Sequence, residues 1–158
     1  MARVNGKIVI ERPLEEVFDF VANQENEPLY NRQMRVARKT TEGPIGVGTS
    51  FHAEMRGVPM TIRVTEFDRP NEIQVRVEMA SMDLTGGLRF ESFNGGTRMR
   101  WRWDLRPRGS LRFLGLVVGS VGRRQERRIW SSLKHLSERG QHPSTERVRA
   151  VSETSATT

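Results

Sequence analysis

Apolar and polar residues alternate along the stretch that decides the fold, residues 72–105, which reads EIQVRVEMASMDLTGGLRFESFNGGTRMRWRWDL. Near its end, Met99, Trp101 and Trp103 are each separated by one arginine, and the same alternation runs through the earlier residues. A period of two residues predicts β-strands with one face buried and the other in water. The stretch therefore predicts a half-buried antiparallel sheet.

The alternation extends back to residue 34, and turn signals rich in glycine and proline divide it into runs. These signals lie at 43–48, 57–59, 69–71 and 94–96. They predict about six antiparallel strands between residues 34 and 105. A further short β-rich segment, residues 4–11, brings the predicted curved sheet to about seven strands.

Helical patterns flank the strands on both sides. A short amphipathic helix is predicted directly after Pro13, and residues 23–31 predict a second short helix or an ordered loop. Residues 111–139 predict a long helix with an apolar stripe, which is the obvious cover for the sheet. The Ser-, Thr- and Ala-rich residues 140–158 have almost nothing to bury and predict a disordered tail. We therefore expect one α+β domain over residues 1–139.

The composition of the chain narrows its class. A length of 158 residues suits a single core, and 35% hydrophobic with 28% charged residues is typical of globular proteins. No apolar stretch approaches the roughly 20 residues that span a bilayer. The first residues lack the apolar core of a secretory signal. Because there is no cysteine, disulfides and thiolate sites are excluded. A cytoplasmic location is the default expectation.

Five short motifs occur in an order that resembles a known family. They are IVIERPLEEVFDFV (8–21), GVGT (46–49), VTEFDRP (64–70), GGTRM (95–99) and LGLVVG (114–119). With these motifs the chain resembles START-like proteins of the polyketide cyclase/dehydrase and lipid transport family. The resemblance covers residues 4–139 and implies a helix-grip fold, in which the sheet wraps around the long C-terminal helix and encloses a cavity. The fold hosts carriers, receptors and enzymes, so it does not fix the function.

The cavity implied by this resemblance would be lined by the inward-facing apolar residues of the strands and by the apolar stripe of the long helix. The candidate ligand-binding residues are Phe51, Met55, Met60, Ile62, Val77, Met79, Leu88, Phe90, Met99, Trp101, Trp103, Val117, Val118 and Val121. Methionine side chains adapt to ligand shape, so we expect binding or transport of a small polyketide-, sterol- or lipid-like molecule. The alternative is that these side chains simply fill a core.

A polyketide cyclase or dehydratase is the second hypothesis, and the question of enzyme activity stays open. Such an enzyme needs an acid or base within hydrogen-bond reach of its substrate. The alternation turns His52, Glu54 and Asp104 outward and places no acid or base inside. Tyr30 and Asn31 are the only polar residues nominated for catalysis. No metal-binding or nucleotide-binding motif is present, so we expect no metal and no cofactor.

A basic surface is the third hypothesis. The net charge is +7, and residues 98–128 hold ten arginines against two acids. The surface candidates are Arg98, Arg100, Arg102, Arg123, Arg124, Arg127 and Arg128. Such a surface could contact an anionic membrane or nucleic acid. The outward face has no aromatic residues for base stacking, which makes nucleic acid the less favoured partner. The plain alternative is a solvated arginine face. Monomer and homodimer both stay open.

Overall fold

The computed structural model of the protein describes residues 2–110 and 115–140, except for the side chains of Leu116 and Val118. The elements are β1 (Ala2–Ile10), α1 (Leu14–Ala22), the 3₁₀ helix η1 (Gln24–Leu29), β2 (Met34–Lys39), β3 (Ser50–Met55), β4 (Val58–Asp68), β5 (Glu72–Met79), β6 (Met82–Phe93), β7 (Gly96–Pro107) and α2 (Gly115–Glu138). Of the predicted long helix, residues 111–114 lie outside the described residues. The predicted disordered tail also does, apart from residue 140.

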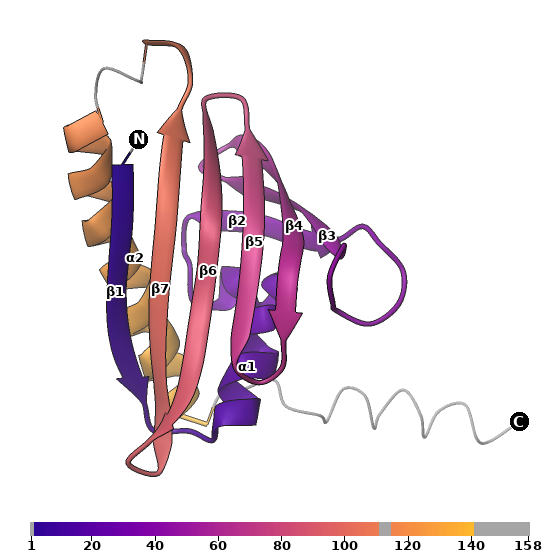
Figure 1. The fold of residues 1–158 in the computed structure, drawn as a ribbon, viewed down its shortest axis with the longest axis vertical. Coiled ribbons are helices and arrows are strands. Elements are labelled where there is room, and N and C mark those ends of the chain that lie inside the picture. Colours follow the sequence, from indigo (N-terminus) through magenta and orange to yellow (C-terminus); the bar gives the residue numbers. More distant parts are fainter. Residues whose placement is uncertain (1, 111–114, 141–158) are drawn as a thin grey trace, which may run out of the picture.

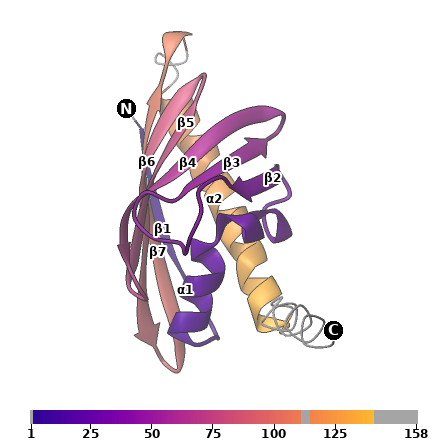
Figure 2. The same ribbon diagram turned by 90° about the vertical axis from the view of Figure 1, so that its right-hand side faces the viewer.

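Seven antiparallel strands form one sheet in the order β1-β7-β6-β5-β4-β3-β2. The helix α2 crosses one face of this sheet (Figure 1), and the turned view in Figure 2 shows α1 and α2 on the same side of it. The α+β helix-grip fold predicted from the sequence is thus confirmed. No helix in the described part of the chain is long and apolar enough to cross a membrane.

The strand register carries the alternating pattern across the whole sheet. Ile62 on β4 is opposite Val77 on β5, which is opposite Leu84 on β6, which in turn is opposite Leu105 on β7. Cross-strand partners share one face of a sheet, so these side chains form a continuous apolar row. The row faces α2. Trp101 points to the same face of β7 as Leu105, and its ring contacts Trp130 of α2 with centroids 5.9 Å apart.

One end of this inner face is a solid core. Phe18 of α1 contacts Phe90 and Phe67 edge to face, with ring centroids 5.1 and 5.4 Å apart. Met99 lies opposite Phe90 in the register and has no exposed surface. Edge-to-face aromatic contacts and close packing make this end a structural layer. No residue of α1 is among those that line the cavity described below.

A close contact between β1 and β7 gives a first testable prediction. Gly6 is opposite Trp101, and a Cβ at Gly6 would lie 2.3 Å from a carbon of the Trp101 ring. We expect Gly6→Ala to lower the free energy of unfolding by about 1–3 kcal/mol, because overpacking displaces the ring. Urea denaturation measures this change.

The control for this prediction is Asn5→Ala on the exposed side of the same strand. That substitution should stay within about 0.5 kcal/mol of the wild type. If Gly6→Ala were equally mild, the Trp101 ring would be free to move away, and its packing on β1 would not be a constraint.

Candidate ligand-binding cavity

A cavity of about 380 Å³ lies between the inner face of the sheet, η1 and α2. Its volume falls within the range of roughly 300–1,000 Å³ that is usual for small-molecule sites. Five methionines belong to its apolar wall, which therefore adapts to the shape of a guest. This wall consists of Met34, Met55, Met60, Ile62, Val75, Val77, Met79, Met82, Leu84, Leu88, Leu105, Val117, Val121 and Ile129.

The structure divides the predicted ligand-binding residues into two groups. Those that line the cavity are Met55, Met60, Ile62, Val77, Met79, Leu88, Trp103, Val117 and Val121. Four others, Phe51, Phe90, Met99 and Trp101, are buried in the core and do not line it. Strand parity identifies the inner face but cannot tell which part of that face another element fills. The side chain of Val118 lies outside the described residues.

Two valines mark an opening of the cavity beside α2. Val117 and Val121 line the cavity and are nevertheless 59% and 56% exposed. A large apolar side chain that is both exposed and part of a cavity wall lies at its rim. The cavity is therefore open to solvent along the first half of α2.

A partly buried carboxyl group, that of Glu126, lies at the polar end of the cavity. Oε2 of Glu126 accepts hydrogen bonds from Nε1 of Trp103, at 2.9 Å, and from Nε1 of Trp130, at 2.7 Å. Burial raises the pKa of Glu126 above its usual value, and the two indole hydrogen bonds offset this in part. Both indoles and the carboxyl line the cavity, so Glu126 holds two aromatic walls in place.

A second carboxyl group, that of Glu27 on η1, lies at the same end. Its Oε1 accepts a hydrogen bond of 2.7 Å from Nδ2 of Asn31. Burial raises the pKa of Glu27 to about 7, the Asn31 hydrogen bond lowers it, and the nearby charge of Glu126 raises it. A carboxyl with such a pKa exchanges its proton near neutral pH.

Tyr30 and Asn31, the two polar residues nominated from the sequence, both line the cavity. The Tyr30 ring lies between Phe20 and Trp130, with centroid separations of 6.1 and 6.0 Å. Burial, followed by the charges of Glu27 and Glu126, raises the pKa of Tyr30 well above its usual value. The phenol therefore stays protonated at neutral pH and is able to donate a hydrogen bond, but not to act as a base.

The expectation that no acid faces the interior is wrong, because Glu27 and Glu126 both do. The sequence held a signal for Glu126, which precedes the buried residues Ile129, Trp130 and Leu133 by three, four and seven positions. That spacing places it on the inward stripe of a helix. Because glutamate is rarely buried, this spacing was not interpreted as evidence for an inward side chain. Glu27 lies in a short 3₁₀ helix, where no amphipathic period exists to be recognised.

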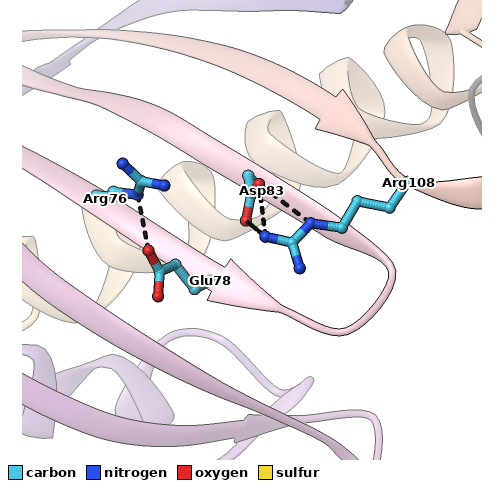
Figure 3. Close-up of polar contacts among 4 residues, drawn as sticks. All are labelled: Arg76, Glu78, Asp83 and Arg108. Carbon is cyan, nitrogen blue, oxygen red and sulfur yellow. Dashed lines mark hydrogen bonds and ion pairs between the residues drawn. The ribbon is translucent and has the colours of Figure 1, made fainter.

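Five acids of the sheet strands point outward, as the alternation predicted, and form surface ion pairs; they are Glu54, Glu78, Asp83, Glu91 and Asp104. Figure 3 shows two of these pairs, Arg76 with Glu78 at 2.8 Å and Arg108 with Asp83 at 2.7 Å. Exposed pairs of this kind add little to stability, and they leave these acids unavailable to the cavity. Among the described residues, no group of three or more His, Cys, Asp or Glu side chains is placed to hold a metal ion.

The seven candidate residues of the basic surface lie on two different surfaces. Arg98, Arg100 and Arg102 project from the outer face of β7, because their parity is opposite to that of Trp101, which contacts α2. The four arginines of α2, Arg123, Arg124, Arg127 and Arg128, lie on the other side of the sheet (Figure 2). The single arginine face expected from the sequence is therefore wrong, because a sheet separates its two halves.

A seven-stranded antiparallel sheet that holds a C-terminal helix across a Met-rich cavity defines a START-like, helix-grip protein. The chain belongs to the family described as polyketide cyclase / dehydrase and lipid transport, whose model matches residues 1–153. Membership of this family indicates hydrophobic ligand binding or a cyclase-like activity.

Solved structures share this fold at low sequence identity. A START superfamily protein from Mycobacterium smegmatis is 11% identical with a TM-score of 0.77, over 88% of this chain and 99% of that one. TTHA0849 from Thermus thermophilus is 16% identical with a TM-score of 0.72, and the match covers 84% of this chain and 94% of that one. DynU16, described as a putative protein in the dynemicin biosynthetic locus, is 12% identical with a TM-score of 0.67, and the match covers 89% of this chain and 48% of that one. No curated protein matches the chain.

Proposed function

We propose that the protein binds and carries a small hydrophobic molecule that bears a neutral hydrogen-bonding group. The observation that carries this proposal is the cavity, in which an apolar wall ends at one cluster of polar side chains. Sites of this composition bind an apolar body and use a few polar groups to orient it. The family described above supports the same conclusion.

The polar end favours particular groups on the ligand. The carboxyls of Glu27 and Glu126 accept hydrogen bonds, so a hydroxyl or N–H group of the ligand suits them. The phenol of Tyr30 donates, so a carbonyl suits it. A carboxylate placed at this end would be repelled by two acidic groups. A hydroxylated polyketide, sterol or lipid-like molecule meets these requirements.

Native mass spectrometry of the purified protein tests the proposal directly. A stoichiometric adduct, identified after denaturing extraction, is the expected result. If no adduct is found and the melting temperature does not shift with a panel of hydroxylated lipids and polyphenols, the cavity is not a binding site.

Filling the cavity gives a second testable prediction. Val77 lies on β5, is 8% exposed and lines the cavity wall. We expect Val77→Trp to weaken the binding of Nile red, a neutral hydrophobic dye, by about tenfold or more, because the indole occupies the space of the guest. Fluorescence titration measures this affinity.

Two further variants keep this test interpretable. Overpacking at Val77 lowers stability by about 1–3 kcal/mol, so Val121→Trp at the exposed rim provides a second obstruction without altering the core. Val47→Trp, at a residue that is 70% exposed and does not line the cavity, should bind the dye like the wild type. Equal binding by all three variants would place the dye elsewhere.

Catalysis is the second candidate function, and Glu27 is the observation that favours it. A cavity carboxyl with a pKa of about 7 is suited to move a proton at neutral pH. Cyclisation or dehydration of a ketide chain would require removal of a proton next to a carbonyl. Exchange of the α-protons of 2-decanone in D₂O, followed by NMR, tests this step. We expect Glu27→Gln to abolish enhanced exchange; a rate in the wild type no greater than in buffer would exclude catalysis of this kind on the ketone.

A further inference from the structure

A second hollow, of about 830 Å³, lies between α2 and the segment that follows η1. We call it the arginine groove, because five arginines line it. They are Arg32, Arg123, Arg124, Arg127 and Arg128. No aspartate or glutamate is among the described residues that line this groove. It is therefore a concave surface of a single charge sign.

The arginines of the groove differ from most others in their partners. Among the described residues, nine other arginines form ion pairs with a carboxylate. The five groove arginines form none, and the hydrogen bond found for them runs from Nη2 of Arg123 to Oγ of Ser120, at 3.0 Å. Clustered positive charges repel one another, and a bound anion relieves that repulsion. Guanidinium groups also match the geometry of carboxylate and phosphate oxygens.

The groove adjoins the hydrophobic cavity directly. Four residues, Tyr30, Asn31, Gln125 and Ile129, line both hollows. The two sites are thus separated by the width of single side chains along α2. A ligand that occupied both sites would therefore pass between these shared side chains.

The two hollows have opposite electrostatic preferences. The polar end of the cavity holds the carboxyls of Glu27 and Glu126, which disfavour a negatively charged group there. The arginine groove, in contrast, favours a negatively charged group. If the ligand has an anionic end, that end therefore belongs outside the cavity, in the groove.

We infer that the ligand is an amphipathic anion, whose apolar body occupies the cavity and whose carboxylate or phosphate group binds in the arginine groove. This inference rests on the proposed function and names the class of its ligand. The negative group gives the ligand an orientation that an apolar cavity alone cannot provide.

Calorimetric titration with three probes of equal chain length tests the inference. The probes are decanol, decanoate and decyl phosphate at pH 7.5, below their aggregation limits. We expect the wild type to bind the two anions about tenfold more tightly than decanol, the equivalent of about 1.4 kcal/mol, and this preference should shrink as salt is added. The double variant Arg124→Gln/Arg128→Gln should lose the preference and bind decanol unchanged.

A matched control removes the same charge elsewhere. Arg38→Gln/Arg63→Gln changes two exposed arginines of β2 and β4 that do not line the groove, and it should keep the full preference. Circular dichroism melting curves of both double variants confirm that they fold.

The outcomes separate the two hypotheses. If none of the three probes binds, the proposed function fails. If decanol binds as tightly as the anions, the cavity stands and the inference is overturned. Binding of inorganic phosphate as tight as that of decyl phosphate would show that the groove takes a free anion, which overturns the amphipathic assignment. Binding to phosphatidylglycerol vesicles, with no preference among the three soluble probes, would indicate that the groove contacts a membrane. That result would also overturn the amphipathic assignment.

Discussion

Glu126→Ala is expected to lower the free energy of unfolding by about 2–4 kcal/mol. The substitution removes the acceptor of two indole N–H groups, those of Trp103 and Trp130. A buried donor left without a partner costs about 1–3 kcal/mol. Removal of the carboxyl also removes the free-energy cost of desolvating its charged form, and this offsets part of the loss. Urea denaturation at pH 7, followed by tryptophan fluorescence, measures the change.

Glu126→Gln is the informative control for this prediction. The amide oxygen of glutamine can accept both indole hydrogen bonds, so we expect a loss of less than about 1 kcal/mol. Glu78→Ala breaks an exposed pair with Arg76 and should also stay below about 1 kcal/mol. If Glu126→Ala were as stable as the wild type, water in the cavity would satisfy both indoles, and Glu126 would have no structural role.

Glu27→Gln is expected to make the protein less sensitive to pH. Burial raises the pKa of Glu27 from 4.5 to about 7 in the folded protein. The folded state therefore holds this proton more tightly than the unfolded chain does. The resulting stabilisation is fully present below pH 4.5 and is lost as the pH rises through 7. Relative to Glu27→Gln, the wild type should lose about 2–3 kcal/mol between pH 5 and pH 9.

Denaturation curves of both proteins across this pH range test the prediction. Glutamine keeps an oxygen that can accept the hydrogen bond from Asn31, so the comparison isolates the charge. Glu15→Gln, at an exposed glutamate of α1, should leave the pH profile of the wild type within a few tenths of a kcal/mol. Parallel profiles for the wild type and Glu27→Gln would mean that the carboxyl is well solvated, which would also weaken the case for catalysis.

These two glutamates connect stability to function. Each occupies a position in the cavity where a neutral side chain would be easier to bury, and polar groups at such positions are typical of binding and catalytic sites. Glu126 fixes two aromatic walls, and Glu27 offers a proton near neutral pH. A hydroxyl group of a bound ligand would donate a further hydrogen bond to one of these carboxyls.

The fold was predictable because its signals are local and repeated. Alternation in residues 72–105 identifies the inner face of three strands without any knowledge of the rest of the chain, because successive side chains of a strand point to opposite faces. The helical spacing that begins after Pro13 predicts α1 in the same way. The outward orientation of Glu54 and Asp104 follows from the same parity and was predicted correctly.

The site was only partly predictable, because it depends on which element covers which part of the sheet. Met60 and Phe90 are both inward residues, yet Met60 lines the cavity whereas Phe18 of α1 covers Phe90. Nothing in the local pattern of either strand distinguishes the two positions.

The sequence by itself determined the sheet, its buried face and the long helix that covers it, since period and residue type suffice for these. Only the tertiary structure decided where the inner face is hollow and that Glu27 and Glu126 meet at the polar end of the cavity. It also decided that the arginines of α2 lie apart from those of β7, in a groove whose described lining residues include no carboxylate. The physical reason is that burial, pKa and ion pairing depend on neighbours that are distant in the chain, which no local pattern specifies.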